Sequence, residues 1–240
     1  MTVLEWPTLD LKSGEIYLNM GTGRSDRSIG PEIAIAIEEA QSKAKKLIED
    51  RAVYDLMAVE SREAKQVVLA GSSVLRCSSR FFDGATLAAL VITTVGQRLE
   101  EESSRLYRQG EYLEGLALDA CGINALNQIG DLVREHLTQE LSGQGYKLGY
   151  SLNPGCHMIP LEEQETVFAL LDGGVIGVSL TDSCLMIPVK SGSAIIALGQ
   201  ELALPGGTAT ACALCNLRAS CTYSPAGAGQ LSKGYRDAEG

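Results

Sequence analysis

The sequence has little histidine, few aromatic residues and no long apolar run. It holds 2 histidines among 240 residues, and aromatic side chains make up 5% of the chain. The longest uncharged apolar run, residues 84–95, is shorter than the roughly 20 residues that span a bilayer. The first residues lack the basic and apolar regions of a secretory signal. We therefore expect a cytoplasmic protein with no membrane partner.

Basic residues are also in deficit, because 20 Lys and Arg stand against 30 Asp and Glu. The net charge of −10 repels phosphate backbones, so we expect no nucleic acid partner. A hydrophobic fraction of 45% allows a chain of this length to bury a core, which excludes a disordered protein. We expect a single domain over residues 1–240, with a cysteine-rich segment at 208–225 and a frayed tail at 230–240.

The scarcity of histidine also limits the catalytic chemistry that the sequence can support. His136 falls in a charged helical stretch, which predicts exposure to solvent, and nothing in the sequence brings a base beside a nucleophile. Hydrolase chemistry is therefore unsupported, and no catalytic residue is assigned.

The apolar pattern favours helices in the first half of the chain and strands in the second. Spacings of three or four residues predict helices at 32–50 and 115–141. A further helix is expected at 161–171, where acidic residues lie at the amino end. Short apolar runs predict strands at 67–70, 87–95, 175–180 and 194–198, and within a strand-like opening at 1–20. Glycine and proline make residues 145–156 rich in predicted turns. This order indicates an α+β fold rather than alternating β-α-β units.

Three of the seven cysteines gather near the carboxyl end, at Cys212, Cys215 and Cys221. An odd number argues against a disulfide scaffold, and two cysteines separated by two residues can bind one metal centre together. Cys156 is the expected fourth ligand, because it too lies in a glycine-rich turn. His157 beside it leaves a Cys/His zinc site open. The spacing does not separate an iron–sulfur cluster from structural zinc, or either from an unligated thiol cluster.

Residues 177–193 hold more polar groups than a connection between two apolar strands needs. Asp182 could accept hydrogen bonds from a ligand amine or hydroxyl, and Lys190 could bind an anion. Alternatively, Thr181, Asp182 and Ser183 cap a turn.

Several short motifs occur together in an order that resembles one known family. They are LEGLALDACG at 113–122, NPGC at 153–156, PLEEQ at 160–164, IGVSLTDS at 176–183 and MIPVKS at 186–191. Over about residues 65–225, this order resembles the reactivation domain of cobalamin-dependent methionine synthase. The likeness is greatest to its free-standing relatives, which also tend to end in a cysteine cluster.

The resemblance implies an α+β domain, with a twisted antiparallel sheet and flanking helices, that binds S-adenosylmethionine and docks on a corrinoid protein. The family's motif Arg-x-x-x-Gly-Tyr falls on residues 151–156, and its Thr-Glu-Ser segment falls on 181–183. The cofactor-binding residues implied by this alignment and by the polar segment are Tyr150, Asn153, Gly155, Thr181, Asp182, Ser183 and Lys190. Ser151 and Cys156 replace the family's arginine and tyrosine. Since guanidinium is the group that best grips a carboxylate, this departure argues against the usual mode of S-adenosylmethionine binding.

We therefore expect a reductive activator that returns the cob(II) form of a corrinoid protein to the active cob(I) or methylated state. In this hypothesis Cys156, Cys212, Cys215 and Cys221 hold a [4Fe–4S] cluster that passes an electron to the partner's cobalt. The alternative is a non-catalytic accessory protein that binds a corrinoid or S-adenosylmethionine and carries a structural zinc site. The two readings differ in the metal that they require.

Overall fold

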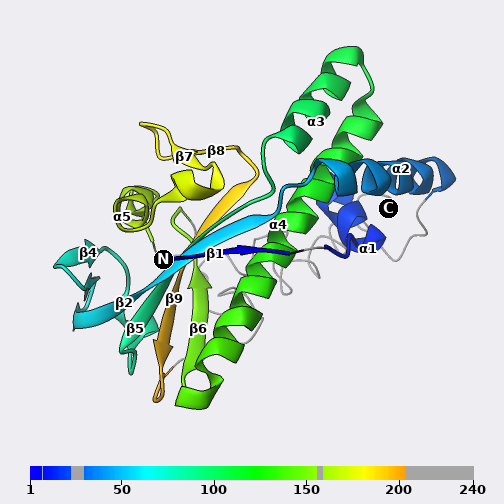
Figure 1. The fold of residues 1–240 in the computed structure, drawn as a ribbon. Coiled ribbons are helices and arrows are strands. Elements are labelled where there is room, and N and C mark those ends of the chain that lie inside the picture. The colour runs from blue at the N-terminus through cyan, green and yellow to red at the C-terminus, as the bar shows by residue number, and fades with distance from the viewer. Residues whose placement is uncertain (7, 23–29, 156–158, 204–240) are drawn as a thin grey trace, which may run out of the picture.

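The computed structural model describes the chain except residues 7, 23–29, 156–158 and 204–240. The described residues form an antiparallel sheet with helices packed against it, which is the α+β arrangement expected from the sequence (Figure 1). The strands are β1 (Thr2–Glu5), β2 (Arg51–Glu63), β3 (Gln66–Leu69), β4 (Ser73–Leu75), β5 (Leu87–Thr94), β6 (Lys147–Leu152), β7 (Ser179–Leu180), β8 (Met186–Ile187) and β9 (Ser191–Gly199).

Five α-helices and four shorter helical turns complete the described part of the chain. The α-helices are α1 (Ser13–Tyr17), α2 (Pro31–Leu47), α3 (Arg98–Gln109), α4 (Tyr112–Leu141) and α5 (Glu163–Leu170). The shorter turns are a π-helical segment at Leu18–Thr22 and 3-10 turns at Ser79–Phe82, Ser142–Gln144 and Gly173–Ile176. Among the described residues, no helix combines the length and the hydropathy that a membrane span requires.

Seven strands make the main sheet in the order β4-β3-β2-β5-β9-β6, and β1 pairs with the first residues of β2. The long strand β2 joins the two parts of this sheet, because its first eight residues pair with β5 and its last residues pair with β3. Strands β7 and β8 form a separate two-stranded hairpin. The edge strand β6 pairs with β9 on one side only among the described strands.

The sheet is buried on both faces. Alternate residues of β5 enter two different clusters: Ala89 and Val91 pack beneath α4, and Leu90 and Ile92 pack toward α5. Figure 1 shows α1 to α4 gathered on one side, with α5 and the β7–β8 hairpin on the other. Burial on both faces explains why residues 87–95 are a continuous apolar run rather than an alternating one.

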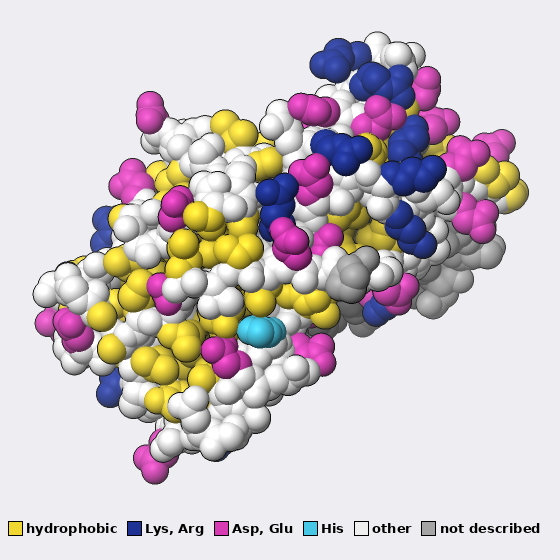
Figure 2. Space-filling model, viewed as in Figure 1, with side chains coloured by type: hydrophobic (Ala, Val, Ile, Leu, Met, Phe, Trp, Pro, Cys, Tyr) yellow, Lys and Arg dark blue, Asp and Glu magenta, His cyan; other side chains and the backbone are white. Residues whose placement is uncertain are grey.

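Apolar and basic side chains lie over different halves of the visible face of the molecule. Figure 2 shows apolar side chains gathered over the sheet half and most of the visible lysine and arginine side chains over the half that carries α2 and α3. The charged half includes two ion pairs on Glu102, one from Arg105 and one from Lys43.

Most of the expected elements are confirmed, and three are wrong. Residues 16–18 are helical rather than extended, because Ile16 is wholly buried among the helices. Residues 147–152 form strand β6 rather than turns, because pairing with β9 overrides the local glycine signal. Only residues 179–180 of the expected strand at 175–180 are extended. The preceding residues form a 3-10 turn, in which the Asp172 carboxylate accepts a hydrogen bond from the Gly174 amide.

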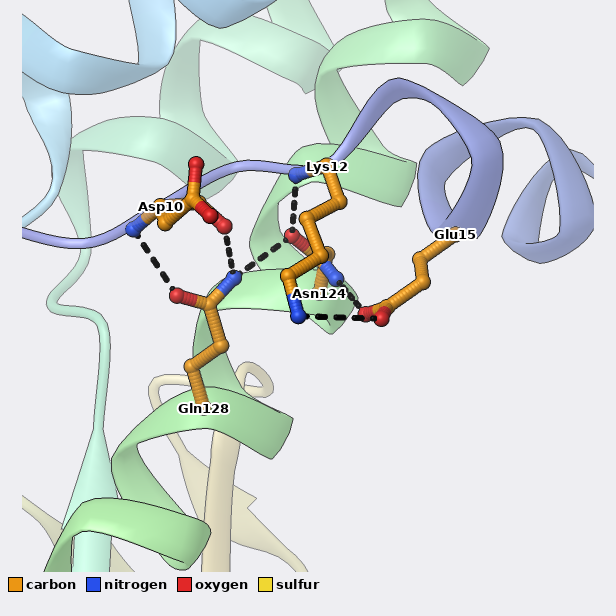
Figure 3. A network of polar contacts seen from close by, with 5 residues as sticks. All are labelled: Asp10, Lys12, Glu15, Asn124 and Gln128. Carbon is orange, nitrogen blue, oxygen red and sulfur yellow. Dashed lines mark hydrogen bonds and ion pairs between the residues drawn. The ribbon is translucent and has the colours of Figure 1, made fainter.

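A polar network ties the amino-terminal segment to α4 (Figure 3). The fully buried Asn124 accepts a hydrogen bond from the Lys12 amide through Oδ1 and donates one to Glu15 through Nδ2. One turn further along α4, the Gln128 side chain bonds both the amide and the carbonyl of Asp10. These bonds satisfy backbone groups of an extended segment, and so they fix its path across the helix.

Candidate functional site

Two of the sequence-predicted residues lie on or just beyond the edge strand β6. Tyr150 is half-buried and packs in the cluster on the α5 face of the sheet. Asn153 follows the strand and donates a hydrogen bond from Nδ2 to the Ser193 carbonyl, at 2.7 Å. Asn153 is therefore held against β9.

Ser193 also binds the start of α5 through its side chain. Its hydroxyl donates to Oε1 of Gln164 at 2.8 Å, and both residues are at least 95% buried. Gly155 and Ile159, on either side of residues 156–158, are joined by a hydrogen bond of 3.0 Å from the Gly155 amide to the Ile159 carbonyl. Gly155 has a φ of +82°, which favours glycine. The residues before and after 156–158 are thus both hydrogen-bonded to Ser193 of β9, through Asn153 and Gln164. They are also hydrogen-bonded to each other, through Gly155 and Ile159.

An arginine from α4 lies beside Ser151, where the family motif has its arginine. The Arg134 Nη1 atom donates to Ser151 Oγ at 3.0 Å and to the Gly149 carbonyl at 3.0 Å. Burial lowers the pKa of Arg134, and the nearby Asp131 carboxylate opposes that shift. Arg134 could not be predicted from the sequence, because its 17-residue separation from Ser151 gives no local signal.

The tight turn between β7 and β8 contains Thr181, Asp182 and Ser183. The Thr181 hydroxyl accepts a hydrogen bond from the Leu185 amide at 3.0 Å and lies 3.1 Å from the Ser183 hydroxyl. The Thr181 carbonyl accepts a further bond from the Cys184 amide at 2.9 Å. These contacts of Thr181 and Ser183 are those expected if the two residues cap a turn. The Asp182 side chain is exposed to solvent and so accessible to a ligand.

Lys190 is directed to the opposite face of the sheet from Tyr150. Its Nζ atom lies 2.8 Å from Oδ1 of Asp119 on α4, and its side chain passes over Gly122 on the same helix. The lysine is 15% exposed and the aspartate 32% exposed. The structure therefore joins Asn153 to β9 but directs Tyr150 and Lys190 to different faces of the sheet. The assignment of the predicted cofactor-binding residues to one ligand site stays a prediction.

A buried carboxylate anchors α5 next to Gln164. Glu163 is 1% exposed, and its Oε1 atom lies 2.5 Å from Nε of Arg76, which extends from the chain after β4. Its other oxygen accepts a hydrogen bond from the Thr166 hydroxyl at 3.2 Å. The sequence placed acidic residues at this helix start but gave no sign that Glu163 is buried.

The predicted metal ligands Cys156, Cys212, Cys215 and Cys221 lie outside the described residues, and so does the alternative ligand His157. The described cysteines, Cys77, Cys121 and Cys184, are buried. Burial raises the pKa of the Cys77 and Cys121 thiols to about 12, which keeps them protonated at neutral pH. Within the described ranges, no three histidine, cysteine or acidic side chains form a group that could hold a metal ion.

Comparison with solved structures shows a related fold. The chain is similar to the crystal structure of the MetH reactivation domain bound to AdoHcy, with a TM-score of 0.58 and 17% sequence identity. The match covers 72% of this chain and 67% of that one. No protein-family model matches the sequence, and neither does any curated protein. At this identity the likeness shows a shared fold, as the sequence resemblance led us to expect.

Proposed function

We propose that this chain is a relative of the MetH reactivation domain that returns an inactive cob(II) corrinoid protein to its cob(I) or methylated state. The observation that carries the proposal is the fold likeness over 72% of the chain. The order of the motifs between residues 113 and 191 supports it independently of the fold. An acidic chain suits docking on a separate, complementary protein surface.

The proposed reaction acts on the partner's cobalt as substrate. One electron from a low-potential donor converts cob(II) to cob(I). A methyl group then passes from a sulfonium donor to cobalt, so that a cobalt–carbon bond forms, a carbon–sulfur bond breaks and the thioether leaves. With S-adenosylmethionine as donor, the thioether is AdoHcy, the ligand of the similar structure. The first step is uphill, and the methyl transfer makes it irreversible.

Two features of the chain fit an S-adenosyl ligand near β6. Arg134 supplies a guanidinium group beside Ser151, where the motif of the family has its own arginine. Asn153 and Gly155 follow in the same segment. In this proposal Arg134 takes over the binding of the ligand carboxylate, to which guanidinium is well matched.

We further propose that the electron reaches cobalt through a [4Fe–4S] cluster held by Cys156, Cys212, Cys215 and Cys221. Chain length permits this ligand set. The described chain reaches Ala203 at the far end of β9 from Ser193, and the six residue steps from Ser193 to Gly199 span about 20 Å. The nine residues from Ala203 to Cys212 can cover up to about 30 Å.

The test combines anaerobic metal analysis with a reactivation assay. A corrinoid protein from the same organism, held as cob(II), is mixed with the chain, titanium(III) citrate and S-adenosylmethionine, and its visible spectrum is followed. We expect conversion to methylcobalt only when all components are present. Unchanged cob(II) despite demonstrated binding of the two proteins would refute the proposed function.

Metal content tests the cluster separately. We expect about four iron and four acid-labile sulfide per chain after anaerobic purification, and loss of both in a Cys212→Ser variant. One zinc per chain without iron would replace the electron relay with a structural metal, whatever the reactivation assay shows.

A further inference from the structure

A groove lies at the end of the sheet opposite Asn153, away from the site proposed above. It has a volume of about 330 Å³ and lies where the chain enters β5, enters β6 and leaves β9. Its lining residues are Arg62, Gly84, Ala85, Thr86, Tyr146, Gln200 and Glu201. Because β9 separates it from Ser193, nothing in the corrinoid proposal accounts for it.

Close backbone contacts build the floor of this groove. A Cβ atom added to Gly84 would lie 2.0 Å from the Glu201 carbonyl oxygen, and one added to Gly199 would lie 2.2 Å from the Gly84 carbonyl oxygen. Only glycine allows the two segments to cross at this distance. Hydrogen bonds from the Thr86 amide to the Leu198 carbonyl and from the Ala203 amide to the Asp83 carbonyl secure the crossing. The groove is therefore preformed.

Arg62 contributes a fixed guanidinium group to the groove. Its Nη1 atom donates to the carbonyls of Phe82 and Ala85, at 2.8 and 2.9 Å. Among the described residues no carboxylate lies within ion-pair distance of it, although the chain carries an excess of acidic groups. Its Nε and Nη2 donors make no hydrogen bond to the described residues. An immobilised guanidinium with donors to spare is well suited to bind a carboxylate in two-point fashion.

The other polar groups supply a hydroxyl donor and an opposite charge. The Tyr146 and Thr86 hydroxyls lie 3.0 Å apart, so one of their two protons is used between them and the other is free to donate. Glu201 is exposed at the groove and pairs with no cation in the described part of the chain. The groove thus presents a guanidinium and a carboxylate that do not pair with each other.

From these groups we infer that the groove binds a free α-amino acid. Arg62 and the Tyr146–Thr86 hydroxyl pair receive its carboxylate, and Glu201 receives its ammonium group. A simple anion would satisfy Arg62 but would be repelled by Glu201, and a simple amine would be repelled by Arg62. A zwitterion uses both charges.

Calorimetric titration of the full chain with glycine, L-methionine, acetate and inorganic phosphate tests this inference. We expect the two amino acids to bind at least tenfold more tightly than acetate or phosphate. Arg62→Gln and Glu201→Gln should each weaken amino acid binding about tenfold or more, because each removes a charge-assisted hydrogen bond. Lys65→Gln, on the exposed turn after β2, should leave it unchanged.

Each alternative result overturns the inference. Tighter binding of phosphate than of glycine would show an anion site, and no binding of either amino acid would show that Arg62 only secures the 82–85 turn. If Arg62→Gln lowers the melting temperature, Glu201→Gln and Tyr146→Phe decide the matter, since neither removes a bond to the backbone. Unchanged glycine binding in both would rule out the site.

Discussion

The ammonium group of Lys190 lies 2.8 Å from the carboxylate of Asp119, and this contact joins the start of β9 to α4. An Asp119→Asn variant should leave a largely buried ammonium without its counter-charge. We expect a loss of about 1–3 kcal/mol in the free energy of unfolding, measured by urea denaturation. Glu114→Gln, an exposed position on the same helix, should change stability by less than about 0.5 kcal/mol. Equal stability of the two variants would show that the ion pair contributes nothing.

The buried hydrogen bond between Ser193 and Gln164 gives a second prediction. Gln164→Leu leaves the Ser193 hydroxyl buried without its acceptor, so it should cost about 1–3 kcal/mol. Adding Ser193→Ala removes that unsatisfied hydroxyl. The double variant should therefore be less destabilised than the sum of the two single variants, as a double-mutant cycle would measure. Strict additivity would argue against direct coupling.

Glu102 should make the fold more sensitive to acid. Its hydrogen bond from Arg105, supported by Lys43, lowers its pKa to about 2. A carboxylate with a lowered pKa in the folded state contributes stability above its ordinary value of 4.5 and loses that contribution as the pH falls toward 2. The unfolding midpoint in urea should fall more steeply between pH 4.5 and 2 in the wild-type protein than in Glu102→Gln. Parallel curves would contradict the prediction.

Tyr54 should make the fold more sensitive to base. Burial, and next the hydrogen bond that its hydroxyl donates to Glu140, raise its pKa to about 12. The unfolded chain therefore loses this proton first as the pH rises, and stability should decline between about pH 10 and 12. Spectroscopic titration should find a late-ionising tyrosine that is absent in Tyr54→Phe. In Glu140→Gln it should ionise at lower pH.

Arg134 offers a test that separates ligand binding from folding. An Arg134→Lys variant keeps the positive charge but loses the planar group that reaches both Ser151 and the Gly149 carbonyl. We expect binding of S-adenosylmethionine to weaken about tenfold or more, with a smaller change in melting temperature than in Arg134→Leu. Asp131→Asn controls for the local charge. Unaltered binding in Arg134→Lys would remove this residue from the proposed ligand site.

The elements that could be predicted are those whose signal is local and periodic. The helix at 115–141 is confirmed because its apolar stripe matches the helical repeat, and the strand at 87–95 is confirmed because both of its faces are buried. Strand β2 was missed, since its last residues are charged and exposed and its extended form depends on partners far along the chain. Strand β6 was missed for a related reason, because its glycines favour turns until β9 pairs with it.

Within the candidate site, too, some residues could be predicted from the sequence and others could not. The sequence drew attention to Asn153, and the structure ties this residue to Ser193 across 40 positions. It could not reveal Arg134 or Asp119, because both act on distant segments from within a helix whose pattern reports only its own periodicity. Long-range polar contacts carry no signal in a single sequence, since any one of many donors could meet any acceptor.

Helix α4 carries side-chain contacts to four segments that are far apart in the chain. Asp119 meets the start of β9, Asn124 the amino-terminal segment, Arg134 strand β6 and Glu140 strand β2. Sliding this helix by a single residue, about 1.5 Å, would break all four together. The sheet and this helix must consequently move together as one rigid block.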